Sequence, residues 1–412
     1  MRRHLLLATV GVVVVAGGLV AAWTLQMRHA SRDIRGSATV EYVTTVAAQH
    51  EPANLPWPMY GHDPAHLRVA TGVGLRPPFR RVWTFHARSL VEFPPAVGYG
   101  RLYFGNNAGV IFAISATTGK RAWRYRSGRC QAMSPALAHN TVYLTFLNRP
   151  PCNSSAGSRG GELVALWAGS GRVRWLRRMA ASESSPVFRG GVVYVGDWGG
   201  RVSCFSATTG KLFWRFRASG KVKGGISLSG NRVYFGTYDS KVYALNATNG
   251  KLVWEAGAQS RLGHPGEFYS TPTLAYGRVY IGATDGKVYS FGAASGDLRW
   301  SQSTGGYVYA SPAVSDGTVY IGSYSGSFYA LDAATGDVRW SFRAGGPISG
   351  AATVIADRVY FATLRGRTYA LDTRTGRQVW SFPDGGYSPV VADPTRVYLV
   401  GRARIYGLEA RR

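Results

Sequence analysis

The sequence predicts an all-β protein, an eight-bladed β-propeller of four-stranded blades that is preceded by one N-terminal transmembrane helix. Three observations predict this architecture. Eight tryptophans recur 39 to 52 residues apart after residue 80, and a glycine stands four residues before seven of them. Short strand-like runs repeat in a fixed order between the tryptophans. A long uncharged apolar run lies within the first 27 residues.

The repeat unit contains four short strands. An inner run resembling Ser-Pro-Ala-Val, a second run of the type Val-Tyr-x-Gly and a third run of the type Tyr-Ala-Leu precede each tryptophan strand. These runs are β-branched or aromatic and are bounded by Gly, Asp, Asn or Ser, which is typical of strands joined by tight turns. A single blade cannot bury both of its faces, so we expect the blades to pack face to face in a ring.

The order of the runs predicts how the ring closes. The repeat region begins with an outer strand at 82–85 and ends with a third strand at 405–408. The last blade therefore lacks an outer strand of its own, and we expect the strand containing Trp83 to supply it. This arrangement would remove the open sheet edges that favour aggregation.

The N-terminus predicts a membrane anchor. The run Leu5 to Met27 contains 23 residues without a charge, enough to cross a hydrocarbon core of about 30 Å at ~1.5 Å per residue. No clear cleavage site follows it, so we interpret residues 1–28 as an uncleaved signal-anchor. Residues 29–56 are then a linker that contributes nothing to the ring, and residues 57–412 form the propeller.

The charge of the chain favours anionic partners. The sequence has 48 Lys and Arg against 21 Asp and Glu, for a net charge of +27. The basic residues are scattered along the chain and form no compact block of the kind that follows a phosphate backbone, so nucleic acid is not expected. Solubility is one explanation of the charge, and an anionic envelope polymer or lipid surface is the other.

The repeat resembles that of the pyrroloquinoline quinone (PQQ)-type propellers. The segments 333–340 and 371–380 match their pattern A-x-D-x-x-T-G-x-x-x-W, and the opening 57–63 resembles the segment that precedes such propellers. The resemblance implies that each tryptophan packs against the neighbouring blade. The tryptophans concerned are Trp83, Trp123, Trp175, Trp214, Trp254, Trp300, Trp340 and Trp380.

This family includes quinoprotein alcohol and glucose dehydrogenases as well as non-enzymatic members, such as the lipoprotein of the outer-membrane β-barrel assembly machinery and extracytoplasmic sensor domains. The dehydrogenases generally carry adjacent cysteines over the cofactor, whereas Cys130, Cys152 and Cys204 are not adjacent. The sequence therefore favours a membrane-anchored, extracytoplasmic binding or scaffolding module with a protein or anionic envelope partner, no cofactor and no catalytic residues. The alternatives are a PQQ-dependent oxidoreductase and a ligand-sensing propeller.

Candidate ligand-binding residues come from one repeat position, two residues before each inner run. We expect this position to line the mouth of the central channel. It is occupied by Glu92, Ala132, Glu183, Lys223, Tyr269, Tyr309, Ser349 and Gly386. Two carboxylates, a lysine and two tyrosines (Glu92, Glu183, Lys223, Tyr269, Tyr309) favour a polar ligand, and a divalent ion on the carboxylates is conceivable. The alternative is a solvated channel, and no motif with metal-ligand spacing occurs.

The three cysteines predict one disulfide. Cys130 lies between two blades and Cys152 lies in an insertion between a second and a third strand. Both connections leave the same end of the propeller, so we expect a Cys130–Cys152 bridge in an oxidising compartment. Cys204 falls inside a third strand and should remain a reduced, buried thiol.

Overall fold

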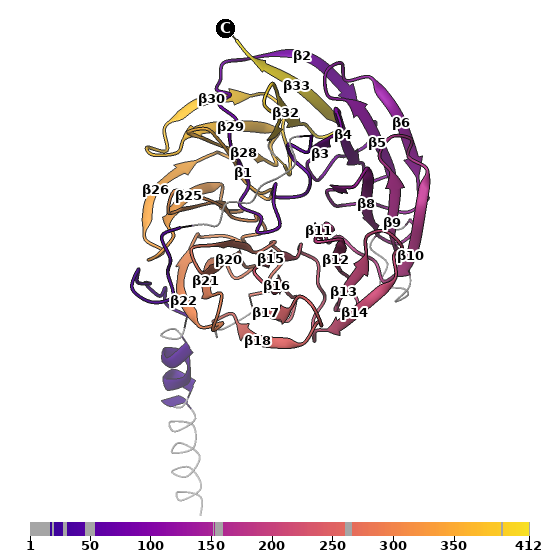
Figure 1. Ribbon diagram of the computed structural model, residues 1–412. Coiled ribbons are helices and arrows are strands. Elements are labelled where there is room, and N and C mark those ends of the chain that lie inside the picture. Colours follow the sequence, from indigo (N-terminus) through magenta and orange to yellow (C-terminus); the bar gives the residue numbers. More distant parts are fainter. Residues whose placement is uncertain are drawn as a thin grey trace, which may run out of the picture.

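The computed structural model describes residues 17–18, 20–27, 31–45, 54–150, 152, 160–259, 266–388 and 390–411. The described residues form an eight-bladed β-propeller of four-stranded blades, as the sequence predicts (Figure 1). The second and third strands of each blade are buried on both faces over most of their length, which places the core between neighbouring blades.

The strands run outward from the axis in chain order within each blade. Blades 1–4 comprise β3 (Ala96–Gly98), β4 (Arg101–Gly105), β5 (Val110–Ser115), β6 (Arg121–Arg126); β7 (Ala136–Ala138), β8 (Thr141–Phe146), β9 (Gly161–Trp167), β10 (Val173–Met179); β11 (Val187–Arg189), β12 (Val192–Gly196), β13 (Arg201–Ser206), β14 (Leu212–Arg217); and β15 (Ser227–Ser229), β16 (Arg232–Gly236), β17 (Lys241–Asn246), β18 (Leu252–Gly257).

Blades 5–8 comprise β19 (Thr273–Ala275), β20 (Arg278–Gly282), β21 (Lys287–Gly292), β22 (Leu298–Ser303); β23 (Ala313–Ser315), β24 (Thr318–Gly322), β25 (Ser327–Asp332), β26 (Val338–Arg343); β27 (Thr353–Ile355), β28 (Arg358–Thr363), β29 (Arg367–Asp372), β30 (Gln378–Phe382), with the short β1 (Val69–Ala70) beside β27; and β31 (Val390–Ala392), β32 (Val397–Val400), β33 (Arg404–Ala410), β2 (Phe79–His86).

The predicted closure of the ring is confirmed. β2 pairs antiparallel with β33, from Phe79 opposite Ala410 to His86 opposite Arg404, and so becomes the outer strand of blade 8. In Figure 1 the indigo-to-purple β2 lies against the yellow β33 at the top of the ring. The two ends of the repeat region are therefore held in one sheet, and no blade lacks its fourth strand.

The tryptophans connect neighbouring blades. The indole N–H of seven of them donates to a carbonyl oxygen in the next blade at 2.8–3.2 Å. Each of these rings lies against the turn glycine of that blade. Trp380 differs, because the third and outer strands of blade 8 come from opposite ends of the chain and no turn joins them. Its ring instead meets Phe79 edge-on at 5.4 Å.

Substituting a docking glycine tests this contact. Gly250 has φ +71°, and a Cβ added there would lie 2.5 Å from the Trp214 ring. Gly128 has φ +72° with nothing within 4 Å of an added Cβ. We expect Gly128→Ala to cost ~1 kcal/mol of unfolding free energy from backbone strain alone. Gly250→Ala should cost a further ~1–3 kcal/mol from overpacking, measured by urea denaturation. Equal losses would argue against tight docking.

Residues 57–70 occupy the channel at the axis of the ring and are here called the plug. Their backbone bonds to the middle residue of successive inner strands. Val97, Leu137, Leu228, Leu274, Val314 and Val354 donate to the plug carbonyls of Trp57, Pro58, Pro64, Ala65, Leu67 and Arg68 at 2.7–3.1 Å. The indigo chain crossing the centre of Figure 1 is this segment. The inner strands of six blades therefore have their free edge satisfied by the plug.

The plug buries charged and polar side chains on the axis. Arg68 is 1% exposed, and its Nη1 donates to the carbonyl oxygens of His66 and Pro312 and to Thr273 Oγ1. Burial, together with the Arg68 charge, lowers the pKa of His66 to about 4, so its imidazole is neutral at physiological pH. These contacts fix the plug within the ring rather than leaving it as a loose leader.

The expectation that residues 29–56 contribute nothing to the ring is wrong for residues 31–45, here called the strap. Ile34 forms an antiparallel bridge with Ser301 of β22, and Asp33 Oδ1 lies 3.1 Å from Lys287 Nζ. Glu41 accepts hydrogen bonds from the backbone amides of Ala294 and Ser295 at 2.6 and 3.0 Å. The strap therefore lies along the outer edge of blade 5.

The reason is a local substitution in the repeat. Asp332 and Asp372 cap the equivalent turns of blades 6 and 7 with their own carboxylates. Blade 5 has Gly292 at that position, where a Cβ would lie 1.8 Å from Glu41 Oε2. Glu41 thus supplies from the strap the carboxylate that blade 5 lacks, and Arg299 pairs with it at 2.6 Å.

The predicted membrane anchor falls largely outside the described residues. Residues 17–18 and 20–27 are helical, whereas 1–16, 19 and 28–30 are not described. Among the described residues, no helix has the length and apolar character needed to cross a membrane.

Candidate functional site

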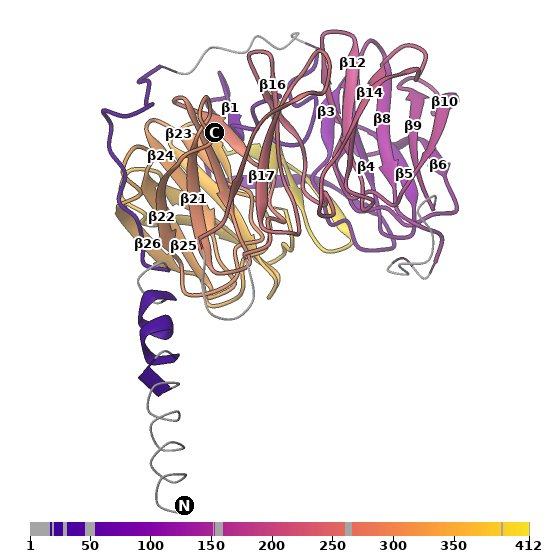
Figure 2. The same cartoon turned by 90° about the horizontal axis from the view of Figure 1, so that it is seen from below.

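A pocket of about 380 Å³ lies on the propeller axis, at the end where outer strands connect to the next inner strands. This end is called the pocket end, and the opposite end, with the turns between third and outer strands, is the turn end. In Figure 2 the turn end is at the top. The floor of the pocket includes Tyr60 of the plug, so the plug closes the channel behind it.

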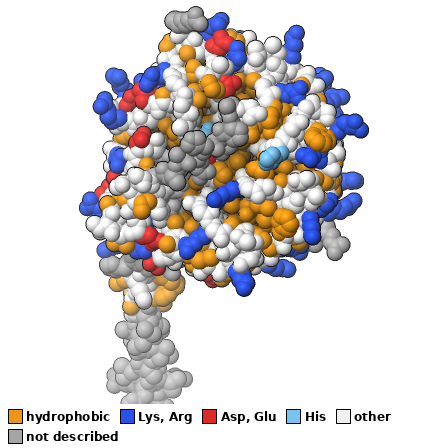
Figure 3. All heavy atoms as spheres, viewed as in Figure 1, with side chains coloured by type: hydrophobic (Ala, Val, Ile, Leu, Met, Phe, Trp, Pro, Cys, Tyr) orange, Lys and Arg blue, Asp and Glu red, His pale blue; other side chains and the backbone are white. Residues whose placement is uncertain are grey.

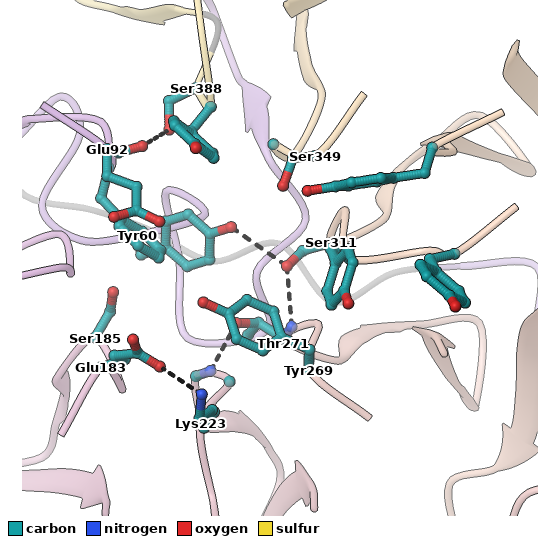
Figure 4. A pocket seen from close by; sticks show the side chains of 18 residues that line it. Tyr60, Glu92, Glu183, Ser185, Lys223, Tyr269, Thr271, Ser311, Ser349 and Ser388 are labelled. Atoms are coloured by element: carbon teal, nitrogen blue, oxygen red, sulfur yellow. Dashed lines mark hydrogen bonds and ion pairs between the residues drawn. The ribbon is translucent and has the colours of Figure 1, made fainter. Parts of the chain in front are cut away.

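The structure brings the predicted residues together. Glu92, Glu183, Lys223, Tyr269 and Tyr309 all line this pocket, as does Ser349 (Figure 4). They come from the starts of six different blades, where the chain turns inward from an outer strand. Ala132 and Gly386 occupy the same repeat position but are not among the lining residues. Ala132 instead packs with Cys130, Leu147 and Ala181 in a small apolar cluster.

The two carboxylates make few hydrogen bonds. Glu92 Oε2 accepts one from Asn107 Nδ2 at 3.4 Å, and Glu183 Oε2 is buried without a hydrogen-bond donor among the described residues. Burial and the repulsion from Glu183 raise the pKa of Glu92 to about 7. Burial also raises the pKa of Glu183, against the attraction of the Lys223 ammonium. The pocket therefore offers carboxylate oxygens to a hydrogen-bond donor.

Lys223 is held between rings rather than projecting into solvent. Its Nζ lies 4.6 Å from the centre of the Trp198 ring, 4.9 Å from that of Tyr238 and 5.8 Å from that of Tyr269. The same Nζ lies 3.7 Å from Glu183 Oε2. Cation–π attraction and this ion pair hold the ammonium in place, so its charge compensates Glu183.

Tyrosines form the opposite wall. The Tyr309 ring meets Tyr269 at 5.4 Å and Tyr324 at 4.9 Å, both edge-on. Tyr307 stands at the mouth with 54% of its surface exposed. Tyr60 donates to Ser311 Oγ at 3.3 Å on the floor. Rings with polar tips give a ligand both apolar contact and hydrogen bonds.

Several residues in and around the pocket were not predicted from the sequence. Tyr324 lines the pocket, and Trp198 and Tyr238 pack against Lys223. Each of these three stands two residues after the glycine that ends a second strand. An aromatic residue at this position in three blades is a repeat signal that marks the pocket end. Tyr60 carries no such signal, because the plug has no counterpart in the repeat.

The predicted cysteine pair is also placed at the pocket end. Cys130 and Cys152 are joined by a disulfide with Cα atoms 5.6 Å apart, whereas Cys204 is a buried free thiol. The insertion residues 151, 153–159 and 260–265 lie outside the described residues. The described bounds place these insertions between β8 and β9 and between β18 and β19, the two connection types expected from the strand order.

The pocket does not fit the quinone cofactor of the family. PQQ carries three carboxylates, so a site for it needs cationic or amide donors around those groups. Here the lining presents two carboxylates, and its lysine is paired with one of them. No two cysteines adjoin in the sequence. Within the described ranges, no three His, Cys, Asp or Glu residues gather as a group that could hold a metal ion.

The raised pKa of Glu92 predicts that the free energy of unfolding depends on pH. Its raised pKa favours the protonated form in the folded protein, so stability falls as pH rises from about 4.5 to about 7. We expect Glu92→Gln to remove this slope and to stabilise the protein at pH 8 by up to about 3 kcal/mol. Denaturation at pH 5 and pH 8 measures it. The Glu255→Gln variant, on the exposed edge of β18, makes the same change in net charge and should keep the pH dependence of the wild type. If the Glu92→Gln variant also kept it, the pH dependence could not be assigned to Glu92.

The fold and the axial pocket define a PQQ-like eight-bladed propeller. Sequence comparison matches one family over residues 80–195, 159–307 and 285–410, described as outer membrane protein assembly factor BamB. The chain belongs to this family.

Two curated relatives show the range of the similarity. Tetrathionate hydrolase from Acidithiobacillus ferrooxidans is 26% identical over 236 residues, which are 41% of this chain and 46% of that protein. Outer membrane protein assembly factor BamB from Nitrosomonas eutropha is 28% identical over 153 residues, which are 34% of this chain and 36% of that protein. The chain thus matches less than half the length of either relative.

Solved structures share the fold. The crystal structure of BamB from Moraxella catarrhalis has a TM-score of 0.66 at 16% identity and covers 80% of this chain and 99% of that one. Quinohemoprotein alcohol dehydrogenase from Comamonas testosteroni has a TM-score of 0.73, also at 16% identity, and covers 88% and 82%. An outer membrane protein assembly factor and an alcohol dehydrogenase therefore share this architecture, and the function has to be argued from the site.

Proposed function

We propose that this protein is a binding and scaffolding propeller of the cell envelope, held by residues 1–28 in the cell membrane with its propeller on the extracytoplasmic side. The observation that carries the proposal is the axial pocket. Its lining combines tyrosines, hydroxyls and two under-bonded carboxylates in a preformed cavity closed behind by the plug. Such a concave, partly apolar site suits recognition of a ligand or partner.

The chemistry of the lining favours binding over catalysis. It includes serines and threonines but neither histidine nor cysteine among the described residues. Ser311 Oγ accepts from Tyr60 and from the Thr271 amide, and Ser185 Oγ accepts from the Ser134 amide. Among the described residues, neither of these hydroxyls forms a hydrogen bond with a histidine or carboxylate side chain that could activate it. Relatives named for BamB support a partner-binding role, and relatives named as quinohemoprotein dehydrogenases define the competing one.

A quinoprotein assay distinguishes the two roles. Protein incubated with PQQ and Ca²⁺ should not oxidise alcohols or aldose sugars with an artificial electron acceptor, because Lys223, the one cation in the described lining, is already paired with Glu183. A known quinoprotein dehydrogenase, treated in the same way, serves as the positive control. Turnover that requires added PQQ would refute the binding assignment.

Crosslinking at the pocket mouth tests the binding role directly. A photoreactive phenylalanine analogue in place of Tyr307, at the mouth, should yield discrete adducts in the cells that make the protein. The same analogue in place of Val338, which is 45% exposed on the rim, is the control. Identical adduct patterns at the two positions, or none at position 307, would count against a pocket ligand.

A further inference from the structure

The positive charge of this protein is concentrated on one part of the ring. Residues 101–217, which cover blades 1–3, contain seventeen Lys and Arg but three Asp and Glu, whereas residues 239–410 contain sixteen and thirteen. The three acids are largely enclosed, since Glu162 is 8% and Asp197 is 2% exposed and Glu183 lines the pocket. The net positive charge is therefore concentrated on the side of the molecule that holds blades 1–3, although the basic residues themselves are scattered along the sequence.

The outer turns, which join third and outer strands at the turn end, show the segregation most clearly. The residue after the turn glycine is Lys120, Arg172, Lys211 and Lys251 in blades 1–4 but Asp297 and Asp337 in blades 5 and 6. The four cations are exposed and have no ion-pair partner within the described part of the chain. Asp337, in contrast, pairs with Arg35 of the strap at 2.7 Å.

Exposed apolar side chains accompany these cations. Val173, Phe213 and Val253, which follow the turn cations on the outer strands, are 47%, 55% and 42% exposed. Blue and orange atoms lie next to one another on the right side and at the bottom of Figure 3, where Figure 1 places blades 1–4. Large apolar side chains are costly to leave in water, whereas the neighbouring charges are well solvated there, and exposed apolar groups rimmed by charge mark an interaction surface. We name this surface the basic arc, made of Arg172, Val173, Lys211, Phe213, Lys251 and Val253.

Blade 5 shows what such a rim can bind. There the strap lies extended along β22, with Ile34 in a β-bridge, and the Glu41 carboxylate takes two turn amides and the Arg299 guanidinium. A segment of this chain that presents an apolar side chain and a carboxylate to the ring is thus already docked on one outer edge, although Arg32 and Arg35 balance Asp33 and Glu41 so that the strap as a whole is neutral. The basic arc offers the same kind of edge on blades 2–4, with more positive charge and without a segment of this chain on it among the described residues.

We propose that the basic arc docks an extended, acidic and apolar segment of a partner protein along the outer turns of blades 2–4. This inference rests on the proposed scaffolding function and names the partner's chemistry. A lipid surface fits less well, because Ser31, the end of the strap nearest the N-terminal helix, bonds to Lys287 at the pocket end. The arc lies at the turn end, away from a membrane that holds the helix.

Binding of two synthetic peptides to the full-length protein in detergent tests the proposal. One peptide alternates Glu with Val, and the other alternates Lys with Val. Fluorescence anisotropy should show that the Glu–Val peptide binds and the Lys–Val peptide does not, with affinity falling as salt rises. The triple variant Arg172→Glu, Lys211→Glu, Lys251→Glu should bind at least about tenfold more weakly. Phe213→Ser, which keeps every charge, should also weaken binding.

The matched control is Arg367→Glu, Arg374→Glu, Arg377→Glu, which makes the same charge change on blade 7. It should bind like the wild type, and thermal melts should show that all variants remain folded. Equal weakening by both triple variants would mean that only net charge matters and would overturn the proposal. So would arc-dependent binding to phosphatidylglycerol vesicles without binding of the Glu–Val peptide. If the peptide experiments failed in this way but the crosslinker at position 307 still captured a partner, only the docking on the basic arc would be refuted, and the proposed binding role of the pocket would stand.

Discussion

Deleting residues 1–90 should lower the free energy of unfolding by several kcal/mol and expose an open sheet edge. The deletion removes β2, whose backbone pairs with β33 over its whole length. It also removes Trp83, whose indole donates to the Ala116 carbonyl at 3.2 Å and lies against Gly119. Trp83 is partly buried, so its loss should cost somewhat less than the ~3–5 kcal/mol of a fully buried tryptophan. The bare edge of β33 should promote aggregation.

A graded series of deletions separates the contributions of the N-terminal segments. Removing 1–53 deletes the strap but keeps the plug and β2, and should cost least, since the strap contacts only the outer edge of the ring, through one β-bridge, hydrogen bonds and ion pairs. Removing 1–75 also deletes the plug, which leaves the inner strands of six blades without their backbone partners. Removing 1–90 then deletes β2. Melting temperatures should fall at each step, and equal values for the last two proteins would refute closure by β2.

The fold was predictable because the sequence repeat occurs eight times. A tryptophan, a turn glycine and three strand signatures in fixed order determine each blade, and their phase at the two ends of the chain determines the closure. The repeat also predicted where Glu92 and Tyr309 lie, because equivalent positions of the repeat occupy equivalent places in each blade. Both residues line the pocket found on the axis.

Features outside the repeat were not predictable in this way. The plug has no period, and its bonds run to strands up to 286 residues away, from Arg68 to Val354. The role of Glu41 depends on Gly292, which stands where blades 6 and 7 have an aspartate. Nothing in the sequence shows that the strap lies beside this glycine and can fill its place. The segregation of charge was missed for a related reason. Turn cations about 40 residues apart in sequence look scattered until the ring places them on neighbouring blades.

Breaking the Cys130–Cys152 disulfide should destabilise the protein and loosen one wall of the pocket. The bridge closes a loop with a sequence separation of 22 residues, which is worth roughly 3 kcal/mol in the chain-entropy model. Cys130 packs in an apolar cluster that also touches Phe93 and Trp198. Phe93 lines the pocket and Trp198 holds Lys223, so the insertion and the ligand site share a support.

The double variant Cys130→Ser, Cys152→Ser should therefore unfold at lower denaturant, and reductant should shift the wild type by the same amount but leave the variant unchanged. Cys204→Ala controls for loss of a buried thiol that makes no bridge. Indole fluorescence should change in the folded double variant if Trp198 moves with the cluster, because its ring packs against the Lys223 ammonium. Free thiols at positions 130 and 152 in protein isolated from the envelope would contradict this prediction, because a disulfide that does not form cannot stabilise the fold or the pocket wall.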